Sequence, residues 1–98
     1  MQIEMPIDGY TVYTKSGCTY CNKLKILFEE KKIECKYINC DEYLKNKENK
    51  EEFLTFMKTL TEHKTFPMVF YDKICIGGYT DTQAFVEINE MEDAFRFE

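Results

Sequence analysis

The chain has 98 residues and a formal net charge of −5, from 13 basic and 18 acidic side chains. This length predicts one small domain spanning residues 1–98, and the 44% hydrophobic content favours a folded globule over a disordered segment. No apolar run approaches the roughly 18 residues of a membrane span, and the acidic balance disfavours nucleic acid as a partner.

The first part of the chain predicts a strand, a helix and a second strand. Residues 10–14 are β-branched or aromatic, which is typical of a strand. Apolar positions then recur at helical spacing between charged residues, which predicts a helix over 19–32. A short second strand is expected over 35–40.

The middle of the chain predicts a second helix. Charged residues dominate 41–52, as expected for a solvated helix face or the approach to a helix. The apolar residues that follow have the i, i+3, i+4, i+7 spacing of a helix laid on a core. They are Phe53, Phe56, Met57 and Leu60.

The C-terminal part predicts a hairpin and a third helix. Residues 68–71 and 74–76 form two short strands around a two-residue turn. Thr80 and Gln83 match a capping box that opens the last helix. The apolar residues expected to share one face of this helix are Ala84, Phe85, Ile88 and Met91.

The element order is therefore β-α-β-α-β-β-α. A strand-helix-strand start implies a right-handed crossover and a parallel pair, and the hairpin adds antiparallel strands. We expect an α/β fold with a mixed four-stranded sheet flanked by three helices.

Cysteine is the unusual component, with five residues in the chain. The number is odd and no export signal is visible at the N-terminus, which argues against a secreted disulfide scaffold. We therefore expect a reducing, cytoplasmic location, where cysteines serve metal binding, redox chemistry or catalysis.

The Cys18-Thr19-Tyr20-Cys21 segment carries the chemistry. It lies where the first strand turns into a helix, so Cys18 is expected at the helix N-terminus, where unpaired N–H groups favour a thiolate. Lys15 adds a positive charge nearby. Cys21, one turn on, can reach Cys18, so we interpret Cys18 as the nucleophile and Cys21 as the resolving thiol.

Two other chemistries fit less well. A structural zinc site needs four ligands, and the chain has one CxxC pair and one histidine, His63. A cysteine protease would need His63 beside Cys18, and nothing in the sequence brings them together. We expect His63 to be a surface residue at the end of the second helix.

The remaining cysteines, Cys35, Cys40 and Cys75, are expected to be half-buried apolar residues. Cys35 and Cys40 lie five apart on a strand and should point to opposite faces. Cys75 is the one to watch for accessory oxidation.

At this point the sequence resembles the dithiol class of glutaredoxins, most closely the short bacterial type. The resemblance spans about residues 10–90. It rests on three segments in register, Lys15-Ser16-Gly17-Cys18-Thr19-Tyr20-Cys21, Thr65-Phe66-Pro67 and Gly77-Gly78-Tyr79-Thr80-Asp81. It implies a thioredoxin fold and a glutathione-dependent oxidoreductase that reduces protein disulfides and glutathione mixed disulfides through a redox-active Cys18–Cys21 pair.

The resemblance also implies a glutathione site. Pro67 matches the family's cis-proline, and the main chain at Phe66 would bond the tripeptide. Asp81 would meet its amino group, and Lys15 its glycyl carboxylate. The full set implied for glutathione is Lys15, Tyr20, Thr65, Phe66, Pro67, Gly78, Tyr79, Thr80 and Asp81.

Two departures from the family pattern keep an alternative open. Thr19 replaces the usual proline, and Phe66 replaces a common valine. Some relatives without that proline hold a [2Fe-2S] cluster between two subunits with glutathione. The alternative function is therefore an iron–sulfur carrier or sensor in which Cys18 is a ligand. A thioredoxin-like protein is a further rival, which the turn at Gly78 to Asp81 argues against.

The implied partners follow from the same resemblance. Glutathione is the reductant, and no metal or covalently bound cofactor is expected. Clients are disulfide-containing or glutathionylated proteins; ribonucleotide reductase is a familiar client of similar proteins, and nothing here singles it out. We expect a monomer with no membrane partner.

Overall fold

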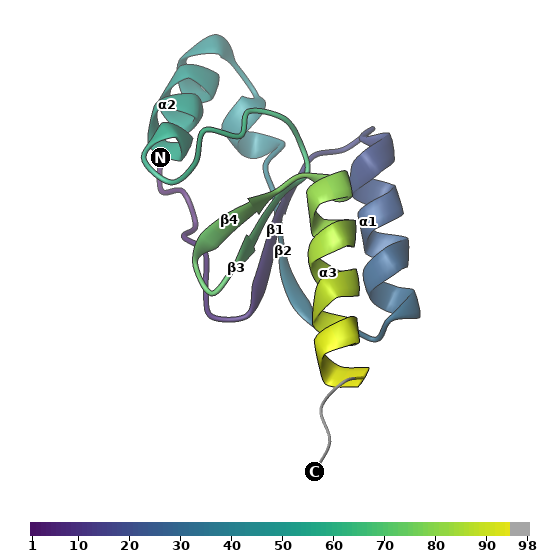
Figure 1. The fold of residues 1–98 in the computed structure, drawn as a ribbon. Helices are drawn as coiled ribbons and strands as arrows, with labels where there is room; N and C mark the ends of the chain where they lie inside the picture. Colours follow the sequence, from purple (N-terminus) through teal and green to yellow (C-terminus); the bar gives the residue numbers. More distant parts are fainter. Residues whose placement is uncertain (95–98) are drawn as a thin grey trace.

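The computed structural model describes residues 1–94 of the chain, with side chains through Met91. The elements follow the predicted order (Figure 1). They are β1 (Tyr10–Thr14), α1 (Thr19–Glu30), β2 (Cys35–Asn39), a 3-10 turn (Glu42–Leu44), α2 (Lys47–Lys58), β3 (Met68–Tyr71), β4 (Ile74–Gly77) and α3 (Tyr79–Ala94).

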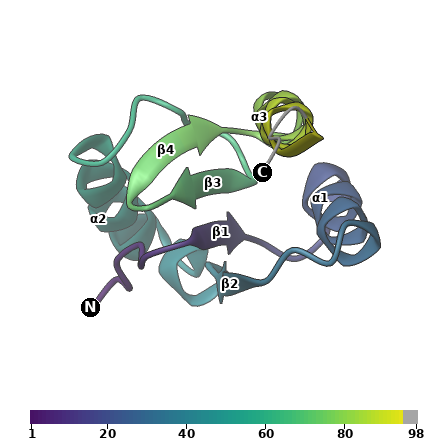
Figure 2. The same cartoon turned by 60° about the horizontal axis from the view of Figure 1, so that its bottom comes forward.

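The four strands form one mixed sheet in the order β2-β1-β3-β4. β1 pairs with β2 in parallel and with β3 antiparallel, and β4 pairs with β3 antiparallel. Helix α2 covers one face, while α1 and α3 lie side by side on the other (Figure 2). The predicted sheet flanked by three helices is confirmed. No helix in residues 1–94 is long and apolar enough to cross a membrane.

Alternation along the central strands builds a separate core on each face of the sheet. On the α2 side, Tyr13 and Phe70 pack with Phe53, and all three are fully buried. On the α1 and α3 side, Val12 and Val69 pack with residues of both helices. The sheet is therefore buried on both faces, so consecutive residues of the central strands are fully buried, over 11–13 in β1 and 68–70 in β3.

Helix α2 begins inside the charge-rich segment rather than after it. The Asn46 side chain accepts a hydrogen bond from the Asn49 N–H at 2.8 Å, which caps the first turn. The helix ends at Lys58, so Leu60 lies beyond it, although Leu60 still packs against the same core. The predicted helix is present, and its apolar spacing continues past its last turn.

Helix α3 begins at Tyr79, so the predicted capping box at Thr80 and Gln83 is wrong. The Thr82 N–H donates to the Gly78 carbonyl at 3.0 Å, which makes Gly78 the residue that precedes the helix. Asp81 in the first turn accepts from the Gly78 N–H at 3.4 Å. The cap is supplied by a carboxylate inside the first turn, since glycine has no side chain to offer.

The apolar residues of α3 do share a face, but that face is largely exposed. Ile88 and Met91 are 56% and 58% exposed, whereas Val86 is 3% exposed and packs into the core. Phe85 is half-buried, with its ring centroid 5.5 Å from that of Tyr71. The helix packs against α1 as well as the sheet. Part of its apolar face borders a cavity along the outer strand β4, which Phe85 and Ile88 line together with Ile74.

This orientation of α3 predicts that two truncations on the helix differ in their effect on stability. Val86→Ala should lower the free energy of unfolding by about 2 kcal/mol, because it empties a filled core position. Ile88→Ala should change it by less than about 0.5 kcal/mol, as is usual for an exposed side chain. Urea unfolding of both variants measures this, and equal losses would contradict the orientation.

Candidate active site

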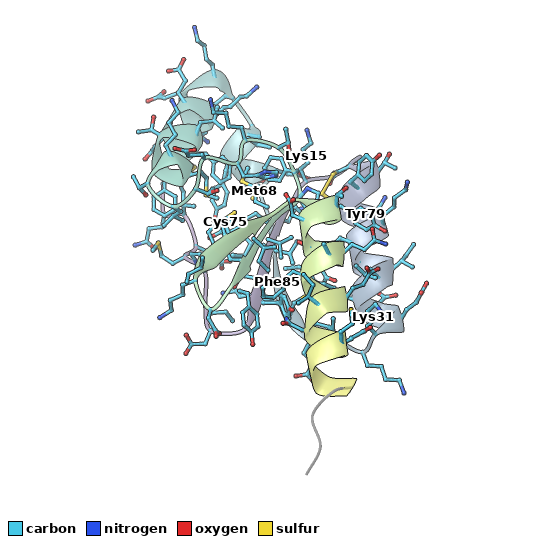
Figure 3. All side chains as sticks on the ribbon, in the orientation of Figure 1. Lys15, Lys31, Met68, Cys75, Tyr79 and Phe85 are labelled. Carbon is cyan, nitrogen blue, oxygen red and sulfur yellow. A yellow bond between two sulfur atoms is a disulfide. The ribbon has the colours of Figure 1, made fainter. Side chains whose placement is uncertain are left out.

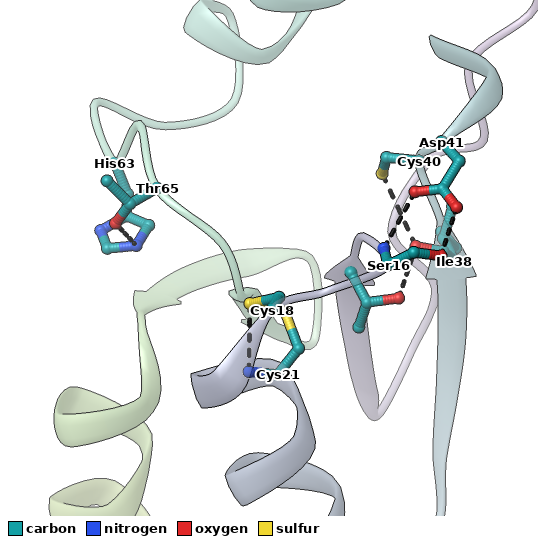
Figure 4. Close-up of a disulfide and its surroundings, with 9 residues drawn as sticks. Ser16, Cys18, Cys21, Ile38, Cys40, Asp41, His63 and Thr65 are labelled. Carbon is teal, nitrogen blue, oxygen red and sulfur yellow. Dashed lines mark hydrogen bonds between the residues drawn. A yellow bond between two sulfur atoms is a disulfide. The ribbon is translucent and has the colours of Figure 1, made fainter. Parts of the chain in front are cut away.

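Cys18 lies at the N-terminus of α1, where the sequence predicted it. Gly17, with φ of +70°, turns the chain after β1, and Cys18 itself is extended. The Cys18 Sγ accepts a hydrogen bond from the Cys21 N–H at 3.2 Å (Figure 4). The sulfur therefore occupies the place of an N-cap oxygen, where a helix N–H and the helix dipole stabilise negative charge.

Cys18 and Cys21 are joined in a disulfide, with their Cα atoms 5.2 Å apart. Cys18 is 9% exposed and Cys21 5%. Cys18 lines a cavity together with Lys15, and Cys21 lines a second cavity that Lys15 also borders. The two bonded cysteines therefore adjoin different cavities.

A carboxylate that the sequence analysis did not single out anchors the turn before Cys18. Asp41 accepts hydrogen bonds from the Ser16 N–H, at 2.9 Å, and from the Ser16 hydroxyl (Figure 4). These donors hold the pKa of the Asp41 carboxyl below its ordinary value. Asp41 follows β2, so these bonds tie the turn to the end of the neighbouring strand.

Eight of the nine residues implied for glutathione line one cavity of about 240 Å³ beside α3. The Phe66–Pro67 bond in its wall is cis, as expected for the match to the family's cis-proline. Tyr20 and Tyr79 meet across it, with ring centroids 5.8 Å apart. The eight residues are Tyr20, Thr65, Phe66, Pro67, Gly78, Tyr79, Thr80 and Asp81.

The ninth residue, Lys15, lines a neighbouring cavity of about 450 Å³ that also contains Cys18. Thr65 and Phe66 belong to both cavities and separate them. The Lys15 Nζ lies 5.5 Å from the centre of the Phe66 ring, a cation–π contact. Lys15 and Tyr79 lie at the same end of the molecule as the disulfide (Figure 3).

His63 is not the plain surface residue that the sequence predicted. It is half-buried and lines the smaller cavity, with its Nε2 3.3 Å from the Thr65 hydroxyl (Figure 4). Its ring lies 3.2 Å from the place that a Cβ on Gly78 would occupy, so glycine there makes room for it. Its position two residues before Thr65-Phe66-Pro67 was the signal that could have placed it.

The three other cysteines are free thiols in the structure. Cys40 is fully buried, and burial raises the pKa of its thiol to about 12. Cys35 is half-buried on the opposite face, as the odd spacing predicted, and burial raises its thiol pKa as well. Cys75 is half-buried in β4. Within residues 1–94, no three His, Cys, Asp or Glu side chains gather as metal ligands would.

Sequence comparison finds one family across most of the chain. The family model described as Glutaredoxin matches residues 10–76. Glutaredoxin 1 of Rickettsia felis is 36% identical over 67 residues, which span 68% of this chain and 61% of that protein. Glutaredoxin-1 of Ectromelia virus is 32% identical over 95 residues, which span 94% of this chain and 82% of that protein. The match thus covers about three fifths of the length of the rickettsial relative.

Solved structures share the fold. Glutaredoxin 1 from Francisella tularensis, complexed with cacodylate, superposes with a TM-score of 0.68 at 27% identity, over 82% of this chain and 93% of that one. A buckwheat glutaredoxin–glutathione complex superposes with a TM-score of 0.69 at 21% identity, over 88% and 74%. The predicted thioredoxin fold is confirmed.

The burial of the thiols predicts their order of alkylation in the reduced, folded protein. Cys40 should react with iodoacetamide at least about a hundredfold more slowly than Cys18, because the alkylated species is the thiolate and the Cys40 thiol is both buried and high in pKa. Mass spectrometry after timed labelling at pH 7.5 measures this. In urea the difference should largely vanish. Comparable labelling of both thiols in the folded protein would contradict the prediction.

Proposed function

The chain belongs to the glutaredoxin family, and on this premise we propose that it is a glutathione-dependent thiol–disulfide oxidoreductase. The observation that carries the proposal is the position of Cys18. Its sulfur accepts a helix N–H and opens beside a cavity lined by the residues implied for glutathione. Since the thiolate is the attacking species, a site that favours the thiolate favours exchange.

With a glutathionylated client, Cys18 performs the exchange alone. Its thiolate attacks the glutathione sulfur, the client's S–S bond breaks, and the client leaves as a thiolate that takes a proton from solvent. A second glutathione thiolate then attacks the Cys18–glutathione disulfide and releases oxidised glutathione. The net exchange converts one glutathionylated client and one glutathione into the client thiol and oxidised glutathione.

With a protein disulfide, Cys21 takes part. Cys18 attacks one client sulfur and forms a mixed disulfide, and the Cys21 thiolate then attacks Cys18. The client leaves fully reduced, and the Cys18–Cys21 disulfide remains, with the two residues in the geometry described above. Two glutathione molecules return this disulfide to the dithiol and leave as one molecule of oxidised glutathione.

The smaller cavity suits the γ-glutamyl end of glutathione. The first N–H groups of α3 are unpaired within the helix and offer donors to its carboxylate. Asp81 lines the same cavity and brings a negative charge for its amino group. Lys15 is left for the glycyl carboxylate in the neighbouring cavity. We place this activity in the cytoplasm, where thiols are kept reduced.

Substitution of the two cysteines should have different effects on the two reactions. Cys18→Ser should abolish turnover, because it removes the nucleophile. Cys21→Ser should retain reduction of a glutathione mixed disulfide but lose reduction of protein disulfides by the two-thiol route. A coupled glutathione-reductase assay with each substrate measures both. Equal loss in the two variants on the mixed disulfide would sink this division.

Two substitutions of Asp81 can distinguish its role in capping α3 from its proposed contact with glutathione. Asp81→Asn keeps an oxygen that can accept from the Gly78 N–H but removes the charge; Asp81→Ala removes both. If the carboxylate meets the ammonium group of glutathione, both variants lose a charge-assisted bond of about 1.5–3 kcal/mol. The glutathione concentration for half-maximal turnover should then rise by roughly one to two orders of magnitude in both.

The melting temperature supplies the control for Asp81. Asp81→Ala should melt lower than the wild-type chain, while Asp81→Asn should melt close to it, because the cap is kept. The rate of Cys18 alkylation should stay unchanged in both. An unaltered glutathione dependence in Asp81→Asn would assign Asp81 to the helix cap alone.

A further inference from the structure

The larger cavity beside Cys18 is lined by three lysines and by no acidic residue. Lys15 comes from the turn before α1, Lys50 from α2 and Lys64 from the segment before β3, so three separate parts of the chain bring positive charge to one place. Among the described residues, none of the three has a carboxylate within 4.0 Å. A cluster of like positive charge thus lies beside Cys18 in a chain whose net charge is −5.

Acidic residues do lie on the same helix, but they do not face the cavity. Glu48 and Glu51 flank Lys50 in the sequence of α2, and both are exposed without lining the cavity. The rest of its wall is apolar or neutral, from Leu44, Thr65 and Phe66. The three lysines are themselves exposed, and their like charges beside this wall reinforce one another, so together they attract anions more strongly than a single surface lysine.

Glutathione does not balance three positive charges. Under the proposed function, its γ-glutamyl carboxylate and amino group are held beside α3, which leaves the glycyl carboxylate as the one anionic group on the lysine side. That carboxylate brings one negative charge to a cavity lined by three lysines. Two positive charges are therefore left without a counter-charge from glutathione, whichever lysines the carboxylate contacts.

We propose that this cavity, which we call the lysine cavity, receives acidic side chains next to the reactive cysteine of client proteins. The inference rests on the proposed function and names its preferred substrates, which are disulfides in Asp- or Glu-rich segments. A client segment must approach Cys18 for its sulfur to be attacked, and the cavity adjoins that sulfur. Carboxylates there neutralise Lys50 and Lys64 and draw the client cysteine toward Cys18.

The test uses two synthetic peptides and no glutathione. Both carry one cysteine activated as a 2-pyridyl disulfide; one has Asp and Glu beside the cysteine, and the other has Asn and Gln. Cys18 of the reduced protein attacks the peptide sulfur and expels pyridine-2-thione. Cys21 then releases the peptide thiol and closes the Cys18–Cys21 disulfide. The two electrons of the dithiol thus reduce one peptide disulfide, and the coloured thione reports the rate.

At low ionic strength the acidic peptide should react about tenfold faster than the neutral one, and high salt should largely remove this advantage. Lys50→Gln and Lys64→Gln should each reduce the ratio of the two rates several-fold. Lys36→Gln is the matched control, because it makes the same change in net charge on β2, and Lys36 lines neither cavity. It should leave the ratio unchanged.

Three results would overturn the inference. Equal rates for the two peptides with the wild-type chain would show that the cavity does not select acidic clients, although the proposed function would stand. A ratio lowered as much by Lys36→Gln as by Lys50→Gln would assign the preference to net charge alone. Release of no thione from either peptide would overturn the proposed oxidoreductase activity together with this inference.

Discussion

The position of β1 between β2 and β3, and the directions of the four strands, are the constraint on which the site depends. Because β1 and β2 are parallel, β3 runs opposite to them and β4 runs opposite to β3, the C-terminal ends of β1, β2 and β4 and the start of β3 all lie at one end of the sheet. The residues just beyond these points are Cys18, Asp41, Pro67 and Gly78. The strand topology alone therefore brings four segments that are distant in sequence to the same end of the sheet.

Two helices begin at that same end of the sheet, and their N-termini make it favourable for negatively charged groups. Both α1 and α3 follow strands that end there, so both direct their unpaired N–H groups and the positive ends of their dipoles toward the shared cavities. One helix start favours the Cys18 thiolate, and the other suits a carboxylate. Lysines that line the cavity next to Phe66 add further positive charge. This end of the sheet is therefore suited to anionic partners, although the chain is acidic as a whole.

Local sequence signals were enough for the strands, for the order of the elements and for Cys18 at a helix start, because each depends on a few neighbouring residues. The site residues that the sequence missed depend on contacts between distant segments: Asp41, after β2, contacts Ser16, after the adjacent strand β1, and His63 meets Gly78 fifteen positions later. The start of α3 was misplaced because a glycine cap has no side chain to signal it. Its exposed apolar face shows that helical periodicity gives the grouping of residues but not which group is buried.

The exposed apolar face of α3 lies beside an outer strand of the sheet, and this combination bears on contacts between copies of the chain. β4 is an outer strand of the sheet, Ile74 on it is 74% exposed, and Ile88 and Met91 of α3 lie open as well. An open strand edge flanked by apolar side chains invites pairing between molecules. The strand is only four residues long, and a register shift at Val69 and Phe70 interrupts its pairing with β3, both of which limit such pairing. Any self-association in concentrated solution is therefore expected to be weak, and to involve this face rather than the end of the sheet that holds the disulfide.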